Sequence, residues 1–131
     1  MPFSVRLLPE LSVIEIRLSA RVVIEELRSL ATQVMLLAEQ TGFRHALADC
    51  RDYLDGPCLG EIYFLTKEIA NWPVGARGVQ ALVAPSDPRA SADVQFYVET
   101  AHAYGTRARM FATRDAAIEW LREVGPPPRL P

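Results

Sequence analysis

Apolar and polar residues along the chain follow spacings that predict five strands and four helices. Residues 3–8 and 11–18 are predicted to be two strands joined at Pro9–Glu10, because apolar and polar side chains alternate along the second of them, as in a half-buried strand. The strongest helix prediction covers residues 22–41, where apolar residues recur three and four positions apart and Gly42 follows as a left-handed C-cap. The other three strands are expected at residues 44–50, 78–84 and 107–112.

Helix start and stop signals place the remaining helices. A second helix is expected at residues 59–72, with Pro73 ending it. Asp87 and Pro88 are the residue types that favour the N-cap and the first position of a third helix, and Thr113 is expected to cap the last one. Helices that alternate with strands in this way indicate that the strands pair in parallel.

The element order predicts an α/β domain with a mixed, mostly parallel five-stranded sheet whose first strand is antiparallel. If consecutive strands lie side by side, right-handed crossovers place most of the four helices on one face of the sheet. The other face is then expected to be partly open, because polar side chains alternate with apolar neighbours at Arg6, Glu15, Arg17, Gln80, Arg107 and Arg109.

Length and composition indicate one domain at residues 1–124, followed by a disordered Pro-rich tail at residues 125–131. The chain is 50% hydrophobic with a formal net charge of −2, so it can build a core and lacks the basic block that nucleic-acid binding needs. Its apolar runs are shorter than the ~20 residues of a membrane span. No signal peptide is evident at the N-terminus, so a cytoplasmic location is expected.

The cysteines and histidines are few and far apart. Cys50 and Cys58 have no second cysteine or histidine pair nearby, whereas a zinc site needs about four ligands at short spacings, so no metal and no cofactor are expected. His45 lies on a predicted strand and His102 on a predicted helix. A Cys58–His102 nucleophile pair is one hypothesis. The other is a surface histidine and a small buried cysteine, since no glycine motif for an oxyanion hole accompanies the pair.

Residues 49–58 are the main candidate site. They are predicted to form a loop between the third strand and the second helix, and ligands of open α/β sheets bind at the carboxyl ends of strands. The run contains three acids, a tyrosine and both cysteines, but no serine, threonine or glycine-rich phosphate cradle. The candidate partner- or ligand-binding residues, the last two on the following helix, are Asp49, Arg51, Asp52, Tyr53, Asp55, Cys58, Tyr63 and Phe64.

Each of these residues also has a structural interpretation. The three acids of the loop could act in acid–base chemistry with raised pKa values, or Asp52 and Asp55 could be solvated turn formers while Asp49 caps backbone amides of the loop. Tyr63 and Phe64, together with apolar residues of the first helix, could line a small apolar pocket, form a dimer surface or simply fill the core.

Three segments carry a resemblance to a known family: VIEEL at residues 23–27, ALAD at 46–49 and RMFATRDAAIEWL at 109–121. With the element order, they make residues 11–124 similar to the STAS-like superfamily of sulfate transporters and anti-sigma-factor antagonists, in particular its SpoIIAA-like branch of small bacterial proteins. The resemblance implies the α/β fold described above and, in the antagonists, a protein partner controlled by a phosphorylated serine in the loop after the third strand.

The phosphorylation switch of that family has no counterpart here. Asp49 matches the acid at the end of the family's third strand, but no serine or threonine lies between Asp49 and Thr66. The same loop could still dock a partner without a phosphate.

Three function hypotheses follow from the sequence. The first is a non-catalytic protein-interaction or regulatory module, a homodimer, that acts through residues 49–58 and the adjoining helix; it requires a closed core and an exposed apolar patch near Tyr63 and Phe64. The second is a carrier or sensor of a small apolar or anionic ligand, which requires an enclosed apolar cavity of ~300 Å³ or more with a few polar groups. The third is an enzyme that uses Asp49 or Cys58 in a cleft, with a shifted pKa and a base within reach.

Overall fold

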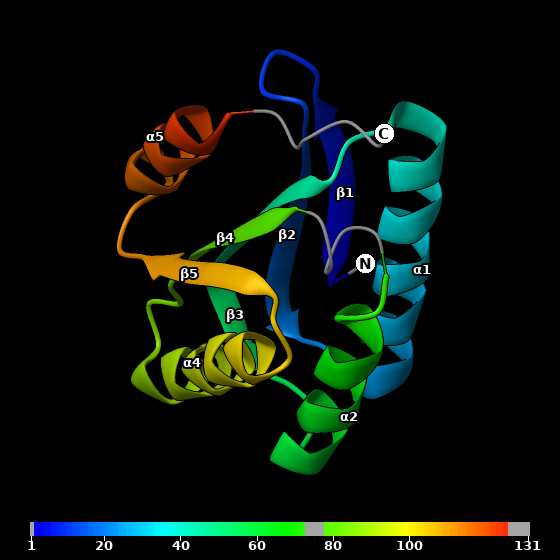
Figure 1. The fold of residues 1–131 in the computed structure, drawn as a ribbon. Coiled ribbons are helices and arrows are strands. Elements are labelled where there is room, and N and C mark those ends of the chain that lie inside the picture. Colours follow the sequence, from blue (N-terminus) through cyan, green and yellow to red (C-terminus); the bar gives the residue numbers. More distant parts are fainter. Residues whose placement is uncertain (1, 73–77, 126–131) are drawn as a thin grey trace.

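A five-stranded mixed sheet forms the centre of the molecule (Figure 1). The computed structural model describes residues 2–72 and 78–125. The strands lie side by side in chain order: β1 (Phe3–Leu8), β2 (Val13–Arg21), β3 (His45–Asp55), β4 (Val79–Val83) and β5 (Arg107–Phe111). β1 pairs with β2 antiparallel, and every later neighbour pairs in parallel, which confirms the predicted sheet.

The helices of the described residues lie on both faces of this sheet, but unequally. They are α1 (Ile24–Thr41), α2 (Leu59–Ile69), α4 (Pro88–Ala103) and α5 (Arg114–Val124). α1, α2 and α4 lie on one face, here called the helical face, and α5 lies on the other, here called the α5 face (Figure 1). The prediction that most helices share one face is therefore confirmed.

Strand periodicity separates the two cores. On β2, Ile14 faces α1 while its neighbour Val13 faces α5, because successive strand residues point to opposite faces. The α5 core is closely packed, and its buried members are Val13, Leu47, Val79, Ala81, Val83, Ala117 and Leu121.

The predicted helix caps are confirmed. The Asp87 carboxylate accepts a hydrogen bond from the Ala90 N–H at 2.9 Å, with Pro88 in the first turn of α4. The Thr113 hydroxyl accepts one from the Ala116 N–H at 3.1 Å. Gly42 ends α1 with φ 79°, a left-handed conformation that glycine adopts without steric cost.

Two predicted boundaries at the carboxyl ends of strands are wrong. β3 continues to Asp55 instead of ending at Cys50, and β2 continues to Arg21 instead of ending at Leu18, because the two extensions pair with each other. The helix predicted at residues 59–72 ends at Ile69. Pro73 and residues 126–131 of the predicted disordered tail lie outside the described residues, whereas Gly125 follows α5 directly.

A buried histidine ties the end of α5 to the sheet. His45, at the start of β3, accepts a hydrogen bond at Nδ1 from the Val79 N–H at 3.0 Å. Its other nitrogen, Nε2, therefore carries the proton of the neutral ring and donates to the Gly125 carbonyl at 2.7 Å. Burial lowers the pKa of His45, the Gly125 hydrogen bond opposes this, and the nearby Arg107 lowers the pKa further.

We therefore predict that stability falls when His45 is protonated. The folded protein favours the neutral ring, so this contribution is complete above the unfolded-state pKa of 6.5 and is lost as the pH falls from there through the lower pKa of the folded state. Melting temperatures between about pH 7.5 and about pH 5.5 should drop more steeply for the wild type than for His45→Gln. Equal slopes for the two proteins would contradict the assignment, and His102→Gln, on the surface side of α4, is the control.

Candidate functional site

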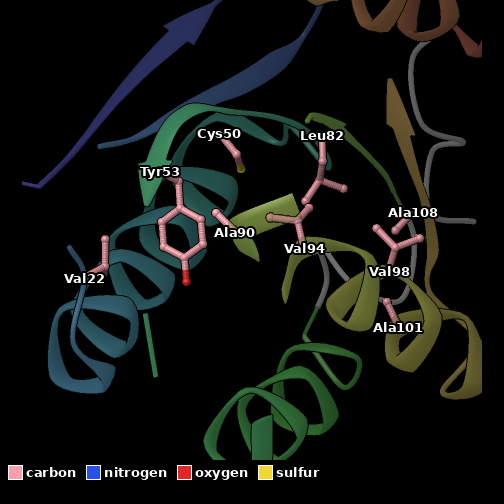
Figure 2. Packing of buried hydrophobic residues seen from close by; sticks show 9 residues of the cluster. All are labelled: Val22, Cys50, Tyr53, Leu82, Ala90, Val94, Val98, Ala101 and Ala108. Atoms are coloured by element: carbon pink, nitrogen blue, oxygen red, sulfur yellow. The ribbon is translucent and has the colours of Figure 1, made fainter. Parts of the chain in front are cut away.

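The residues 49–58 do not form the predicted loop. Asp49 to Asp55 belong to β3, and the connection to α2 is only Gly56–Pro57, with Cys58 as the N-cap residue of α2. β3 carries one extra residue opposite β2 between Asp49 and Asp52, which is a β-bulge. The bulge explains why Cys50 and Tyr53, three positions apart, are both buried on the helical face, as Figure 2 shows.

The candidate residues of this run are therefore divided among different surroundings. Asp49, Cys50 and Tyr53 are buried, whereas Arg51, Asp52, Asp55 and Cys58 are exposed. Tyr53 covers Gly56 so closely that any side chain at position 56 would meet its hydroxyl oxygen at 1.8 Å. The structure thus brings Tyr53 into the helical core and does not bring the exposed acids to it.

Asp49 is held in its ionised form on the α5 face. Arg51 donates to its carboxylate from Nε at 2.9 Å and from Nη2 at 2.7 Å, and Arg17 adds a longer bond at 3.4 Å. These hydrogen bonds and charges hold the pKa of Asp49 below its usual value, against the effect of burial. The hypothesis of a raised pKa is therefore wrong for Asp49, and the alternative, in which Asp49 binds a backbone amide, is confirmed by the Arg51 N–H at 3.2 Å.

Glu15, on the neighbouring strand β2, is also a buried carboxylate that is hydrogen-bonded to arginines. Its buried carboxylate accepts hydrogen bonds from Arg6 on β1 and, at 3.0 Å, from Arg114 at the start of α5. Two buried carboxylates bound by arginines thus cover the part of the α5 face beside α5, and this confirms the polar face predicted from alternation. Gln80 is the exception: it lies on the helical face, where it is buried and accepts a hydrogen bond from Tyr97.

The cysteines and histidines do not assemble into a reactive pair within the described residues. The exposed Cys58 donates its backbone N–H to Glu61 at 3.1 Å, and the ring of His102 bonds the Ala108 carbonyl. Burial raises the pKa of the Cys50 thiol to about 12, so it stays protonated at neutral pH. No cluster of metal-ligating side chains occurs in the described part of the chain.

An apolar cavity, partly open to solvent, lies on the helical face of the sheet. A cavity of about 170 Å³ lies between the sheet and α1, α2 and α4. Its lining is mostly aliphatic, with residues from all three helices and from strands β2, β3 and β4. The volume is smaller than the ~300 Å³ expected of a carrier, and the cavity is partly open instead of enclosed, so the structure meets neither part of that expectation.

Small side chains explain why the cavity exists. β3 presents Ala46, Ala48 and Cys50 to the helical face, where a parallel strand more often carries valine, isoleucine or leucine. α2 packs chiefly against α4 and α1 rather than on the strands, and Ile62 and Leu65 of α2 cover the cavity from the far side. Because α2 packs against other helices and the β3 side chains below it are small, a space remains between α2 and the sheet.

A few polar groups reach this apolar cavity. The Tyr97 hydroxyl on α4 donates to Gln80 on β4, so the two polar side chains satisfy each other at its wall. Tyr53 and Asp93 also line it. Burial raises the pKa of Asp93, the nearby Asp55 raises it further, and Arg89 opposes them.

Sequence reasoning missed Tyr97 and Asp93 as site residues. One signal was present: Gln80 is the single polar residue in an apolar strand, and a buried amide requires a buried hydrogen-bond partner. Asp93 gave no such signal, because an aspartate on an amphipathic helix is ordinarily on the solvated face.

Tyr63 and Phe64 belong to a separate surface. Both are exposed, Phe64 at 61%, and together with Leu59 and Tyr104 they form an apolar patch across α2 and α4. The hydroxyls of Tyr63 and Tyr104 are hydrogen-bonded, and their ring centroids are 5.9 Å apart. The structure therefore places these two predicted residues on the outer side of α2, away from the cavity lining.

Comparisons with known proteins add no family to this description. Neither a scan against protein-family models nor a search of curated proteins finds a match to this chain. Within the described residues, none of the helices combines the length and the apolar character that crossing a membrane requires.

The same substitution at a buried and at an exposed aspartate of β3 should have different effects on stability. Asp49→Asn removes a buried charge bound by two arginines, so it should lower the free energy of unfolding by about 1–3 kcal/mol. Asp52→Asn changes an exposed group on the same strand and should stay within ~0.5 kcal/mol of the wild type. Urea unfolding at neutral pH measures both, and a cost below ~0.5 kcal/mol for Asp49→Asn would show that the arginine contacts do not hold the carboxylate.

Proposed function

We propose that this protein binds a small apolar molecule in the cavity between α2 and the sheet. The observation that carries the proposal is the cavity itself, of about 170 Å³ and lined mainly by aliphatic side chains. Ligand sites of proteins are typically concave and mostly apolar, with a small number of polar groups that orient the ligand. Gln80, Tyr97, Tyr53 and Asp93 supply such groups here.

The cavity volume limits the ligand to about the size of a single ring. An engineered apolar cavity of about 150 Å³ in another protein binds benzene. A cavity of about 170 Å³ therefore accommodates a body of six to eight or so non-hydrogen atoms. Larger molecules would require α2 to move.

The apolar wall of the cavity also favours a ligand. The cavity is partly open, so this wall is in contact with water when no ligand is bound. A ligand that covers the wall removes apolar surface from water, at about 25 cal/mol per Å². A bound apolar molecule would therefore stabilise the protein, by an amount that rises with the logarithm of the ligand concentration.

Ala48→Leu tests the proposal by filling the cavity from its floor. The leucine should occupy the space, keep or raise stability, and weaken binding of toluene at least ~10-fold in a titration followed by amide NMR shifts. Ala92→Leu makes the same change on the exposed side of α4 and should leave toluene binding as in the wild type.

The proposed function would be wrong if toluene shifts no amide signals of cavity residues in the wild type. It would also be wrong if Ala48→Leu binds toluene as well as Ala92→Leu does.

A second candidate function is a protein-interaction module that associates with itself. The exposed patch of Leu59, Tyr63, Phe64 and Tyr104 favours it, because contiguous apolar surface marks interaction sites. The STAS-like resemblance of the sequence supports the same function, since it implies a non-catalytic domain that acts through a protein partner. In this second candidate the partner is another copy of the chain, with the patch at the contact.

Phe64→Ser tests self-association. If the patch forms a dimer contact, the wild type should sediment as a dimer at high concentration and the variant should require at least ~10-fold more protein to do so. Leu36→Ser, which changes an exposed apolar residue on α1, is the control and should behave as the wild type. A wild type that remains monomeric at every concentration would rule this candidate out.

A further inference from the structure

The cavity volume limits the size of the ligand, and the charged groups around the cavity indicate the ligand's charge. Among the described lining residues, Asp93 is the only carboxylic acid, and none is a lysine, arginine or histidine. No salt bridge to Asp93 occurs among the described residues, in contrast to Asp49 and Glu15 on the α5 face, which arginines hold.

The acidic group lies at one end of the cavity. Asp93 is in the second turn of α4, which begins where β4 ends, and Tyr53 and Asp55 are at the end of β3. These three residues therefore lie toward the carboxyl edge of the sheet. The charge of Asp93 raises the pKa of Tyr53, and that of Asp55 raises the pKa of Asp93, in keeping with this placement.

Tyr53 adds a polar atom at the same end. Its side chain projects from β3 toward the helices beside Cys50 (Figure 2). Tyr53 is buried and lines the cavity, and no hydrogen bond from its hydroxyl to another group is present within the described residues. The hydroxyl is thus available as an acceptor for a donor group on a ligand.

We infer that the cavity takes a protonated amine with a small apolar body, such as an arylalkylamine, and discriminates against carboxylates. The apolar body would occupy the space between α2 and Ala48, and the ammonium would lie beside Asp93 with the Tyr53 hydroxyl as a second acceptor. This inference rests on the proposed function, because it assigns the head group of the same ligand.

Electrostatics supports the choice of a cation. Among the described residues, the charges that act on Asp93 are those of Asp55 and Arg89, so two acids face a single arginine and this end of the cavity has an excess of negative charge. The Asp93 carboxylate has a raised pKa because burial and Asp55 penalise its charge, and an ammonium would relieve that penalty. A carboxylate ligand would instead add a third negative charge.

The test compares three ligands with the same ring and different head groups. Isothermal titration at neutral pH would measure 2-phenylethylamine, which is cationic, 2-phenylethanol, which is neutral, and phenylacetate, which is anionic. The expected order is amine tightest and acid weakest, with amine and acid at least ~10-fold apart. In Asp93→Asn this ratio should collapse to within ~3-fold while the alcohol binds as before, and Asp52→Asn should keep the wild-type ratio.

The outcomes separate this inference from the function on which it rests. If toluene and 2-phenylethanol bind but the amine is no tighter than the acid, the inference is overturned and the cavity remains a binding site for apolar molecules. If Asp93→Asn keeps the wild-type preference, the inference is likewise overturned. If none of the ligands binds, the proposed function fails and the inference fails with it.

Discussion

The distance between α2 and the sheet is the constraint on which the helical face depends. The side chains that β3 turns toward α2 are small: Ala46, Ala48 and Cys50. α2 packs mainly against α4 and α1, so it does not move closer to the strand. Two apolar layers held apart in this way cannot close the space without moving a helix or changing side chains. The cavity, the position of its polar groups and the exposure of the outer side of α2 all follow from that arrangement.

The α5 face differs from the helical face in both packing and buried charge. Leu47 and its neighbours are fully buried against α5, and the uncovered part of the sheet carries Glu15 and Asp49 in arginine hydrogen bonds. Among the described residues, no fully buried side-chain nitrogen or oxygen lacks a hydrogen-bond partner. Charge on the α5 face is therefore satisfied within the chain, whereas the charge of Asp93 on the helical face is not.

Periodicity predicted the elements, and local chemistry predicted their caps. Strand β1 and the caps Asp87 and Thr113 could be read from the sequence, because each depends on residues close in the chain. The extension of β3 could not, since Asp52 and Asp55 next to Gly56 have the composition of a turn. Pairing with the end of β2 overrode that local preference.

The candidate site was predicted less well than the fold. A buried carboxylate such as Asp49 looks the same in a sequence whether arginines or another acid surround it, and Arg17 is 32 positions away in the chain. The small residues of β3 can be seen in the sequence. A cavity, however, depends on the distance between α2 and these residues, and contacts between helices determine that distance. Charge near the cavity likewise depends on α4 approaching the end of β3.

A crystal structure under xenon pressure would show the space between the layers itself, because xenon binds in apolar cavities of this size. We predict xenon density between β3 and α2, in contact with Ala48, Leu65 and Val94. A structure in which α2 packs directly on Ala48, with no xenon between the layers, would contradict it.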